Sequence, residues 1–313
     1  MEAGSNWAIV LAGGDGVRLQ ALTWRFSTDG RPKQFCRLLD DRTLLGETRA
    51  RLCPIVANER TLFSVNGQHR PFYREELRDL VPYQLVEQPA NRGTGVAAIY
   101  ALARLKRLDP EAVVGIFPSD HHCDQQVAFR RVVAGAYRAA RQDSTRVVLV
   151  GTVPDRAEAD YGWIARGAAR AKTSSAAGLP VHGVEAFVEK PRESLAESLM
   201  AGGALWNTFM MVGKARAFFS LFEQATPHLC AGFAPLMRAI GRPAEPSIAA
   251  AHYESIPAVD LSRDVLALRS ERLTVIEAPP MGWTDLGRAD RVLALRSRLG
   301  LEHGRPTPQL LRA

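Results

Sequence analysis

WAIVLAGGDGVRL, residues Trp7–Leu19, decides how the rest of the chain is interpreted. Its first part, Trp7–Ala12, is a short apolar run that predicts a buried strand. Three glycines follow, and at Gly13, Gly14 and Gly16 the missing side chain would let backbone N–H groups approach phosphate oxygens. The alternative is that the three glycines form only a tight surface turn and bind no phosphate. The spacing is neither a Walker A loop nor GxGxxG, so the glycines alone are weak evidence.

Two cationic residues follow the glycines and strengthen the prediction of a phosphate site. Arg18 has a planar guanidinium that suits a polyphosphate. Lys33 lies in RPKQF (Arg31–Phe35) and brings a second positive charge. We therefore expect Leu11, Ala12 and the glycine loop after them to bind a nucleotide, with both cations nearby.

Short apolar runs alternate with helical runs through the first half of the chain. The predicted strands after the first are 61–65, 83–87, 112–117 and 146–151, and the predicted helices are 43–52, 68–80, 94–108 and 125–141. This order is typical of a parallel sheet with helices on both faces. Such sheets bind ligands beyond the carboxyl ends of their strands. Both the glycine loop and PSDH (Pro118–His121) fall at such an end.

The second half is more mixed. The predicted strands are 184–190, 205–213 and 272–278, the predicted helices are 193–201, 214–224, 229–240 and 288–301, and 172–178 is expected to be a loop of small residues. No internal repeat and no long disordered linker is present. We predict an α/β fold of Rossmann-like type, with a mixed, mostly parallel sheet flanked by helices.

Composition limits the classes of function. The chain has 313 residues, 46% of them hydrophobic, which is enough for a sizeable core, and a formal net charge of +7. The arginines are scattered and no nucleic-acid-binding motif is present, so we expect small anionic substrates and no nucleic acid. No run reaches the roughly 18 apolar residues of a membrane span. The N-terminus lacks signal-peptide features, and four well-separated cysteines predict neither zinc nor disulfides, which favours the cytoplasm.

Six stretches resemble, in the same order, the signatures of sugar-1-phosphate nucleotidyltransferases. They are the glycine loop with RPKQF, then PSDH, ADYGWI (159–164), FVEKP (187–191), LWNTFM (205–210) and GWTDLG (282–287). Together they are far more specific than any one motif. PKQF is especially similar to the mannose-1-phosphate guanylyltransferases. The resemblance implies a fold of the nucleotide-diphospho-sugar transferase type, with one transferase domain over 1–287 and a C-terminal helix and tail over 288–313. It divides that domain into a nucleotide-binding half, 1–151, and a sugar-phosphate-binding half, 152–287.

The resemblance implies a metal and three catalytic cations. Asp120 and Asp285 would hold Mg²⁺ over the α-phosphate, because this ion prefers oxygen ligands and keeps several waters. A turn or capping role is the alternative for Asp120. Arg18, Lys33 and Lys190 would offset the negative charge of the phosphates. The alternative for Lys190 is a surface ion pair with its neighbouring glutamate.

The resemblance also implies binding residues for both substrates. QPANRGTG (Gln88–Gly95) would read the base: Gln88 can both donate and accept, Gly93 would let the base approach a helix N-terminus, and Thr94 adjoins it. An ordinary helix start is the alternative. The residues expected to bind the sugar phosphate are Tyr161, Gly162, Glu189, Lys190, Asn207 and Asp260.

The implied reaction is direct nucleotidyl transfer between two small molecules, most simply from GTP to mannose 1-phosphate, giving GDP-mannose and pyrophosphate. The same chemistry with another base or sugar is an alternative, because Gln88 stands where glutamate is common and Phe209 where glycine is typical. Val17 replaces a usual threonine, and Trp24–Gly30 lengthens the loop. A nucleotide-sugar-binding protein without catalysis is the third hypothesis. The arginine-rich helix over 288–301 is a candidate surface for a homo-oligomer.

Overall fold

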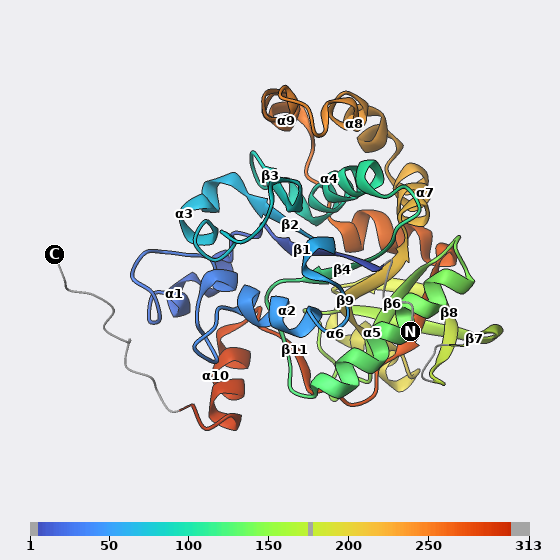
Figure 1. Cartoon of the computed structure of the whole chain (residues 1–313). Helices are drawn as coiled ribbons and strands as arrows, with labels where there is room; N and C mark the ends of the chain where they lie inside the picture. Colours follow the sequence, from blue (N-terminus) through green and yellow to red (C-terminus); the bar gives the residue numbers. More distant parts are fainter. Residues whose placement is uncertain (1–5, 175–177, 302–313) are drawn as a thin grey trace.

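A computed structural model describes residues 6–174 and 178–301 (Figure 1). Within these ranges nine strands form one sheet, in the order β3-β2-β1-β4-β9-β6-β10-β8-β7. Their bounds are β1 Asn6–Ala12, β2 Thr61–Asn66, β3 Leu85–Gln88, β4 Val113–Pro118, β6 Val147–Thr152, β7 Gly162–Ser174, β8 Pro180–Glu189, β9 Leu205–Lys214 and β10 Leu273–Glu277. Two short strands, β5 (His121–Cys123) and β11 (Trp283–Asp285), form a separate antiparallel pair.

The sheet is mixed, with most strands pointing the same way. β1 is parallel to β2 and β4, β2 is parallel to β3, and β6 is parallel to β10. β9 runs antiparallel between β4 and β6, and β8 runs antiparallel to β10. This confirms the predicted α/β fold class. One strand of the second half of the chain, β9, lies between β4 and β6 of the first half, so the two halves share one continuous sheet.

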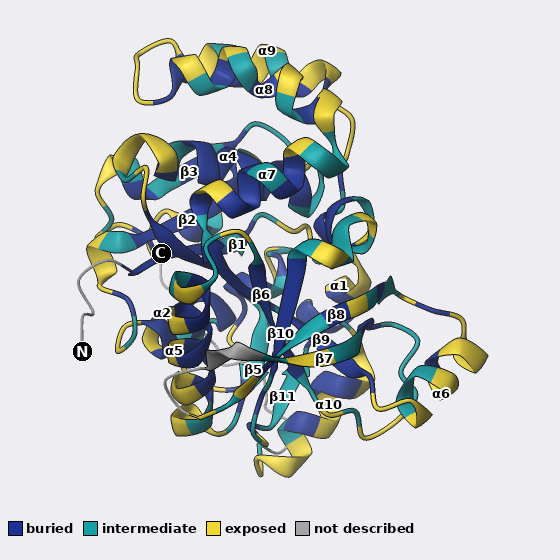
Figure 2. Cartoon of the chain, turned by 90° about the vertical axis from the view of Figure 1, so that its right-hand side faces the viewer, coloured by how far each residue is buried: buried dark blue, intermediate teal, exposed yellow. Residues whose placement is uncertain are grey.

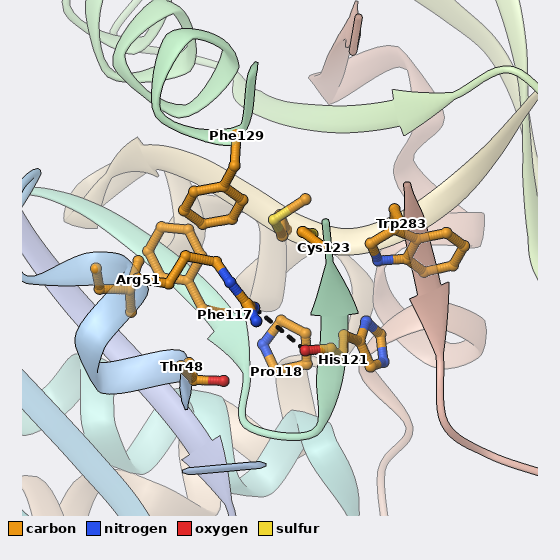
Figure 3. A pocket seen from close by; sticks show the side chains of 10 residues that line it. Thr48, Arg51, Phe117, Pro118, His121, Cys123, Phe129 and Trp283 are labelled. Carbon is orange, nitrogen blue, oxygen red and sulfur yellow. Dashed lines mark hydrogen bonds between the residues drawn. The ribbon is translucent and has the colours of Figure 1, made fainter. Parts of the chain in front are cut away.

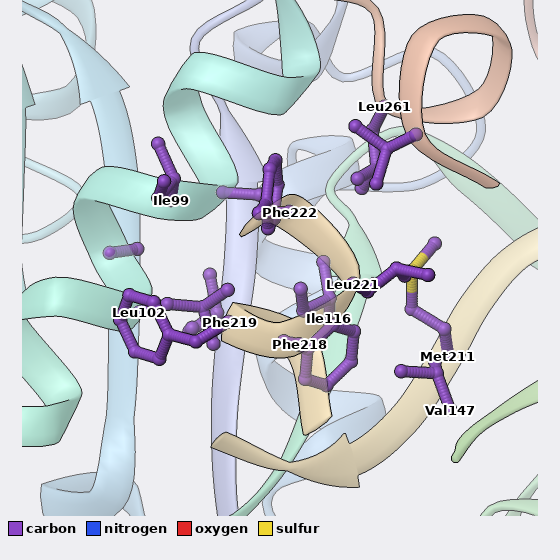
Figure 4. Close-up of a cluster of buried hydrophobic side chains, with 14 of the residues drawn as sticks. Ile99, Leu102, Ile116, Val147, Met211, Phe218, Phe219, Leu221, Phe222 and Leu261 are labelled. Atoms are coloured by element: carbon purple, nitrogen blue, oxygen red, sulfur yellow. The ribbon is translucent and has the colours of Figure 1, made fainter. Parts of the chain in front are cut away.

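Hydrophobic clusters cover both faces of the sheet. In β1, Ile9 packs in the cluster that contains α4 (Gly93–Leu108) and α7 (Ala215–Ala225). Its neighbours Ala8 and Val10 pack in the cluster that contains α2 (Leu44–Leu52) and α5 (Gln126–Gln142). Successive side chains of a strand point to opposite faces, so a strand buried on both sides has a continuous apolar sequence. Figure 4 shows part of the first cluster.

The remaining helices lie around this core. Their bounds are α1 Gln20–Thr23, α3 Arg70–Tyr73, α6 Glu193–Ala201, α8 Pro227–Ala239, α9 Glu245–Ser255 and α10 Ala289–Arg298. α8 and α9 project together from one end of the molecule, at the top of Figures 1 and 2. The buried carboxylate of Glu245, the first residue of α9, ties this helix to α4, because it accepts from the Tyr100 hydroxyl at 2.8 Å and pairs with Arg104. None of the helices in the described ranges has the length and apolar content of a membrane-spanning helix.

The helix predicted at 68–80 is wrong. The structure has a 3₁₀ turn at Gly67–His69, the four-residue α3 and then turns. Side chains from α2 and its N-cap bind the 74–80 segment: Arg49 donates to the Glu76 carbonyl oxygen at 2.7 Å, and the Glu76 carboxylate accepts from Thr43. Arg49 thus takes the Glu76 carbonyl oxygen that a continuing helix would pair with the Leu80 N–H, which donates to the Leu77 carbonyl oxygen instead.

The expected loop at 172–178 is only partly correct. Its first residues end the long strand β7, and residues 175–177 lie outside the described ranges, as does the predicted tail beyond residue 301. β7, α9 and the pair of short strands were not predicted. The sequence of β7, GWIARGAARAKTS, lacks the regular alternation of large apolar side chains that identifies a strand.

Phe222 tests the packing of the first cluster. Its side chain in α7 is 0% exposed, whereas Val127 on α5 is 72% exposed. We expect Phe222→Ala to lower the free energy of unfolding by about 3–5 kcal/mol, because it removes buried surface and leaves a cavity. We expect Val127→Ala, the control, to change it by about 0.5 kcal/mol or less. Urea denaturation measures both, and equal midpoints would contradict this packing.

Candidate active site

The glycine loop is braced by the segment that contains Lys33. Gly16 has a φ of 65°, and a Cβ at this position would lie 3.1 Å from the backbone nitrogen of Lys33. The side-chain amide of Gln34 donates to the carbonyl oxygens of Ala12, at 3.1 Å, and Gly14, at 2.7 Å. Gln34 therefore holds the first part of the loop. Its role was not predicted, although it belongs to the RPKQF motif.

Asp15 anchors the same loop from the other side. Its carboxylate lies 3.3 Å from His69 Nε2 and accepts from Asn91 Nδ2 at 2.8 Å. His69 follows β2 and Asn91 follows β3, so the loop is tied to the ends of two neighbouring strands. No pattern in the sequence singles out Asp15.

Arg18 is exposed on the 3₁₀ turn Val17–Leu19 that follows the loop. Its neighbour Leu19 is buried and donates its N–H to the Gly16 carbonyl oxygen at 3.0 Å. The turn is thus fixed by Leu19, while the guanidinium of Arg18 is left at the surface beside the glycine loop. This position suits a group that meets a ligand from solution.

The structure brings Asp120 and Asp285 to one place. β11 pairs with β5 in a register that sets Asp285 opposite His121, the residue after Asp120. The ammonium of Lys33 lies 3.0 Å from Asp120 Oδ2 and donates to the Leu286 carbonyl oxygen at 2.9 Å. Lys33 therefore links the strand end that carries one acid to the turn that carries the other.

Nearby charges and burial set the protonation of this centre. Burial alone would raise the pKa of Asp120, but the positive charge of Lys33 holds it below its usual value. Asp120 is therefore ionised at neutral pH. Burial lowers the pKa of His121 below its usual range, against Asp120 and Asp285, which would raise it. His121 is therefore neutral at pH 7.

The packing behind this centre is close (Figure 3). The guanidinium of Arg51 donates to the His121 carbonyl oxygen at 3.2 Å. The cavity lined by these residues, Cys123 and Trp283 measures about 10 Å³, room for roughly one water molecule. The strand that follows Asp120 is thus supported from inside the protein.

The donor set at this centre fits Mg²⁺. Among residues 6–174 and 178–301, no group of three or more His, Cys, Asp or Glu residues could hold a metal ion. Mg²⁺ is commonly bound by one or two carboxylates together with substrate phosphates and water, whereas structural zinc takes four protein ligands. Asp120 and Asp285 supply two carboxylates of this kind, and their contact with Mg²⁺ stays a prediction.

A buried arginine also reaches Asp285. The side chain of Arg291, on α10, is 6% exposed and forms ion pairs with Asp285 and, at 2.9 Å, with Glu158. Its guanidinium carbon lies 4.3 Å from the centre of the Tyr161 ring. Sequence reasoning missed this residue, because nothing distinguishes it from the other arginines of its helix.

Three residues predicted to bind the sugar meet where β7, β8 and β9 come together. A Cβ on Gly162 would lie 2.8 Å from Glu189 Oε2 and 3.3 Å from Asn207 Cβ. β7 pairs with β8 so that Gly162 is opposite Glu189, and the side chain of Asn207 accepts from the Phe209 N–H at 3.1 Å. We call Gly162, Glu189 and Asn207 the sugar cluster.

Tyr161 connects the sugar cluster to Asp120 and Asp285, which we call the acid pair. Its ring packs edge-on against Trp206, at 4.9 Å, and Trp283, at 5.2 Å. Trp283 lies on β11, two residues before Asp285. Burial and the nearby Asp285 raise the pKa of Tyr161, so its hydroxyl stays protonated.

Backbone strain occurs at two positions beside these residues. In the described ranges, the non-glycine residues with positive φ are Lys190, at 47°, and Phe209, at 59°. Such conformations cost roughly 1–3 kcal/mol and cluster at functional sites. Lys190 donates its N–H to the Tyr161 carbonyl oxygen at 3.2 Å, and its ammonium lies 2.8 Å from Glu189. The left-handed backbone at Phe209 explains why glycine would fit this position well.

Gln88 lies beneath the glycine loop and is 2% exposed. Its amide donates to Ser64 Oγ at 3.2 Å and accepts from the Tyr253 hydroxyl at 3.3 Å. A Cβ on Gly13 would lie 2.9 Å from Gln88 Nε2. The structure therefore gives Gln88 partners within the protein and places it next to the loop, and its contact with a base stays a prediction.

The backbone of Val259 occupies the space next to Gly93 that a base was predicted to occupy. Gly93 has a φ of 86°, and a Cβ there would overlap the carbonyl oxygen of Val259. The same oxygen accepts from the Gly95 N–H at 2.8 Å, and Thr94 Oγ1 accepts from the Leu261 N–H at 2.9 Å. The approach predicted for a base at the start of α4 is thus made by this backbone segment, and contact of Gly93 and Thr94 with a nucleotide stays a prediction.

Asp260 lies in the segment that covers the start of α4. Its carboxylate accepts from the Arg263 N–H at 2.9 Å and caps the π-helix Leu261–Leu266. The Asp260 N–H in turn donates to Asp264 at 2.8 Å. These contacts give Asp260 a capping role, and its contact with a sugar stays a prediction.

Comparison with known proteins identifies related sequences. The family model "Nucleotidyl transferase" matches residues 7–299. The mannose-1-phosphate guanylyltransferase ManC of Salmonella typhimurium is 32% identical over 292 residues, which cover 90% of this chain and 57% of that protein. The alginate biosynthesis protein AlgA of Pseudomonas aeruginosa is 31% identical over 288 residues, which cover 89% of this chain and 56% of that protein. The chain thus spans a little over half the length of these relatives.

Solved structures share the fold. The mannose-1-phosphate geranyltransferase of Thermus thermophilus superposes with a TM-score of 0.77 at 26% identity, over 93% of this chain and 79% of that one. A UDP-glucose pyrophosphorylase bound to UDP-glucose superposes with a TM-score of 0.58 at 13% identity, over 95% of this chain and 99% of that one, which shows the fold alone. Since the family model extends over almost the entire chain, the chain belongs to the nucleotidyl transferase family.

Proposed function

We propose that this chain transfers a nucleotidyl group from a nucleoside triphosphate to a sugar 1-phosphate and releases pyrophosphate. The observation that carries the proposal is the position of Asp120, Asp285 and Lys33, which are joined to the glycine loop on one side and, through Tyr161, to the sugar cluster on the other. The names of its relatives favour GTP and mannose 1-phosphate as substrates, with GDP-mannose as the product.

The proposed step is a direct displacement. An oxygen of the sugar phosphate forms a bond to the α-phosphorus, while the bond from that phosphorus to the bridging oxygen of pyrophosphate breaks. The phosphate is already a nucleophile, so the protein contributes positioning and charge stabilisation. The glycine-loop N–H groups, Arg18 and Lys33 would bind the triphosphate. Lys190 would bind the sugar phosphate.

The sugar cluster suits a polyhydroxylated ligand. Carboxylate and amide side chains, here Glu189 and Asn207, accept and donate hydrogen bonds to hydroxyl groups. Gly162 lets the two side chains approach the backbone of β7 closely, because any side chain there would meet both. Asn207 has one polar contact already, to the Phe209 N–H, which fixes the direction of its amide.

We further propose Mg²⁺ as the metal, held by Asp120 and Asp285, where it would supply a Lewis acid for the α-phosphate. The support is the two-carboxylate donor set described above. We place the reaction in the cytoplasm, supported by four free cysteine thiols. Small molecules are the proposed partners, and a homo-oligomer stays a prediction.

A pyrophosphate-release assay tests the function. GTP, ATP, UTP and CTP are each combined with mannose 1-phosphate or glucose 1-phosphate, with Mg²⁺ or with EDTA. We expect release that requires both a sugar 1-phosphate and Mg²⁺, and that is fastest with GTP and mannose 1-phosphate. Faster release with another pair would change the substrates but keep the chemistry. Tight nucleotide binding without release in any combination would contradict the proposal and indicate a nucleotide-binding protein without catalysis.

Arg18→Ala separates catalysis from folding. Because the side chain is exposed, we expect thermal unfolding to stay unchanged while kcat/KM falls by about 10²–10³-fold, the range for loss of one group that stabilises developing charge. Arg25→Ala, an exposed arginine of the following loop, is the control and should keep full activity. Full activity of Arg18→Ala, or unfolding of this variant with unchanged specific activity, would refute the role of Arg18.

A further inference from the structure

The C-terminal helix α10 contributes a buried charge to the site through Arg291. We propose that Arg291 is a positioning residue, which orients the Asp285 carboxylate and ties it to the loop that leads into the sugar cluster. The inference rests on the proposed function, where Asp285 acts on the metal and phosphate side. It concerns how two parts of the site keep their relative position: the metal side, which is the acid pair, and the sugar side, which is the sugar cluster and the segment that leads into it.

On the metal side, Asp285 is oriented from two directions. Arg291 Nη1 pairs with Asp285 Oδ1. The other oxygen, Oδ2, would lie 2.6 Å from a Cβ at Gly287, so it occupies the space left by this glycine. The guanidinium therefore holds one oxygen of the carboxylate, while Gly287 leaves space for the other. Groups that hold a metal-binding side chain in this way commonly affect metal affinity by about 10–100-fold.

On the sugar side, the same guanidinium holds the segment before β7. Arg291 Nη2 lies 2.9 Å from Glu158 Oε2 and 3.6 Å from Asp160 Oδ2, and the guanidinium stacks on the Tyr161 ring. The segment is also ordered internally, since the Glu158 carbonyl oxygen accepts from Trp163 Nε1 at 2.9 Å. It leads directly into Gly162, so Arg291 fixes the approach to the sugar cluster.

The charges explain how one arginine can serve both sides. Arg291 faces three carboxylates, those of Asp285, Glu158 and Asp160. If Asp285 turned one oxygen toward a metal, Arg291 would keep its other two partners. A buried arginine that lost its only partner would strongly destabilise the folded protein. The two further carboxylates avoid that cost. The planar guanidinium, with five donors, suits several carboxylates better than a lysine does.

The helix itself is anchored to the nucleotide side. Val292 and Leu295 of α10 pack in a cluster with Leu19, Leu22 and Leu38. Leu19 follows Arg18 and fixes the turn after the glycine loop. α10 thus contacts the nucleotide-side segments through its apolar face, and the acid pair and the sugar side through Arg291.

The test compares Arg291→Ala and Arg291→Lys with Arg288→Ala, on the full chain. Arg288 lies at the start of the same helix, also contacts Asp160, at 3.3 Å, and has a side chain that is 53% exposed. Electron paramagnetic resonance measures Mn²⁺ binding in the presence of GTP. Steady-state kinetics with Mn²⁺ give kcat and the KM for mannose 1-phosphate, and circular dichroism follows folding.

For Arg291→Ala we expect Mn²⁺ affinity to fall by about tenfold and the KM for mannose 1-phosphate to rise by a similar factor, the lower end of the range for groups that orient metal ligands. Arg291→Lys keeps the charge but not the fork, so we expect a smaller loss of about threefold in both. Arg288→Ala should match the parent chain. Parent-like Mn²⁺ affinity and KM in folded Arg291→Ala would overturn the inference. If that variant does not fold, parent-like values in Arg291→Lys would overturn it.

Failure of the proposed function gives a different result. If the parent chain binds Mn²⁺ with GTP but transfers no nucleotidyl group, the function is wrong, and the Mn²⁺ measurement alone decides the role of Arg291. Asp285→Asn provides the reference for that measurement. We expect it to weaken Mn²⁺ binding at least as much as Arg291→Ala, because Arg291 acts through Asp285. Weaker Mn²⁺ binding in Arg291→Ala than in Asp285→Asn would contradict that route.

Discussion

The contacts of the Lys33 ammonium with Asp120 and the Leu286 carbonyl oxygen are the interactions on which the rest of the site depends. They join three segments that are distant in the sequence: the segment with Lys33 and Gln34 that supports the glycine loop, the end of β4, and the turn after β11. Carboxylates that come together repel each other and lose hydration, so they need a cation nearby. Lys33 provides one charge at Asp120, and Arg291 provides another at Asp285. Each of the two acids therefore has a cation of the protein beside it.

Much of the fold could be predicted from local sequence patterns. β1, β2, β4, β6, α4 and α5 have apolar spacings that match their periodicity, and Asp120 could be placed at the sheet edge because it follows a strand. Features that depend on tertiary contacts could not be predicted. The 68–80 segment forms turns because Arg49 binds the Glu76 carbonyl oxygen, and Gly93 is required by the backbone of Val259. Arg291 could not be identified, because its partners come from three separate segments.

Strain and burial concentrate where the two proposed substrates would meet. Lys190 and Phe209 adopt left-handed backbone conformations next to Glu189 and Asn207, while Tyr161 is packed between two tryptophans. A precise arrangement of this kind suits two anions that must be held in line.

The most direct test of the central claim is a crystal structure with GTP and Mn²⁺, measured with anomalous diffraction. We expect one Mn²⁺ peak in contact with both Asp120 and Asp285, at distances of about 2.0–2.6 Å, with the nucleotide phosphates on the same ion. The ammonium of Lys33 and the guanidinium of Arg291 should lie beside the two acids. An Mn²⁺ bound elsewhere, with the triphosphate away from both carboxylates, would contradict the account.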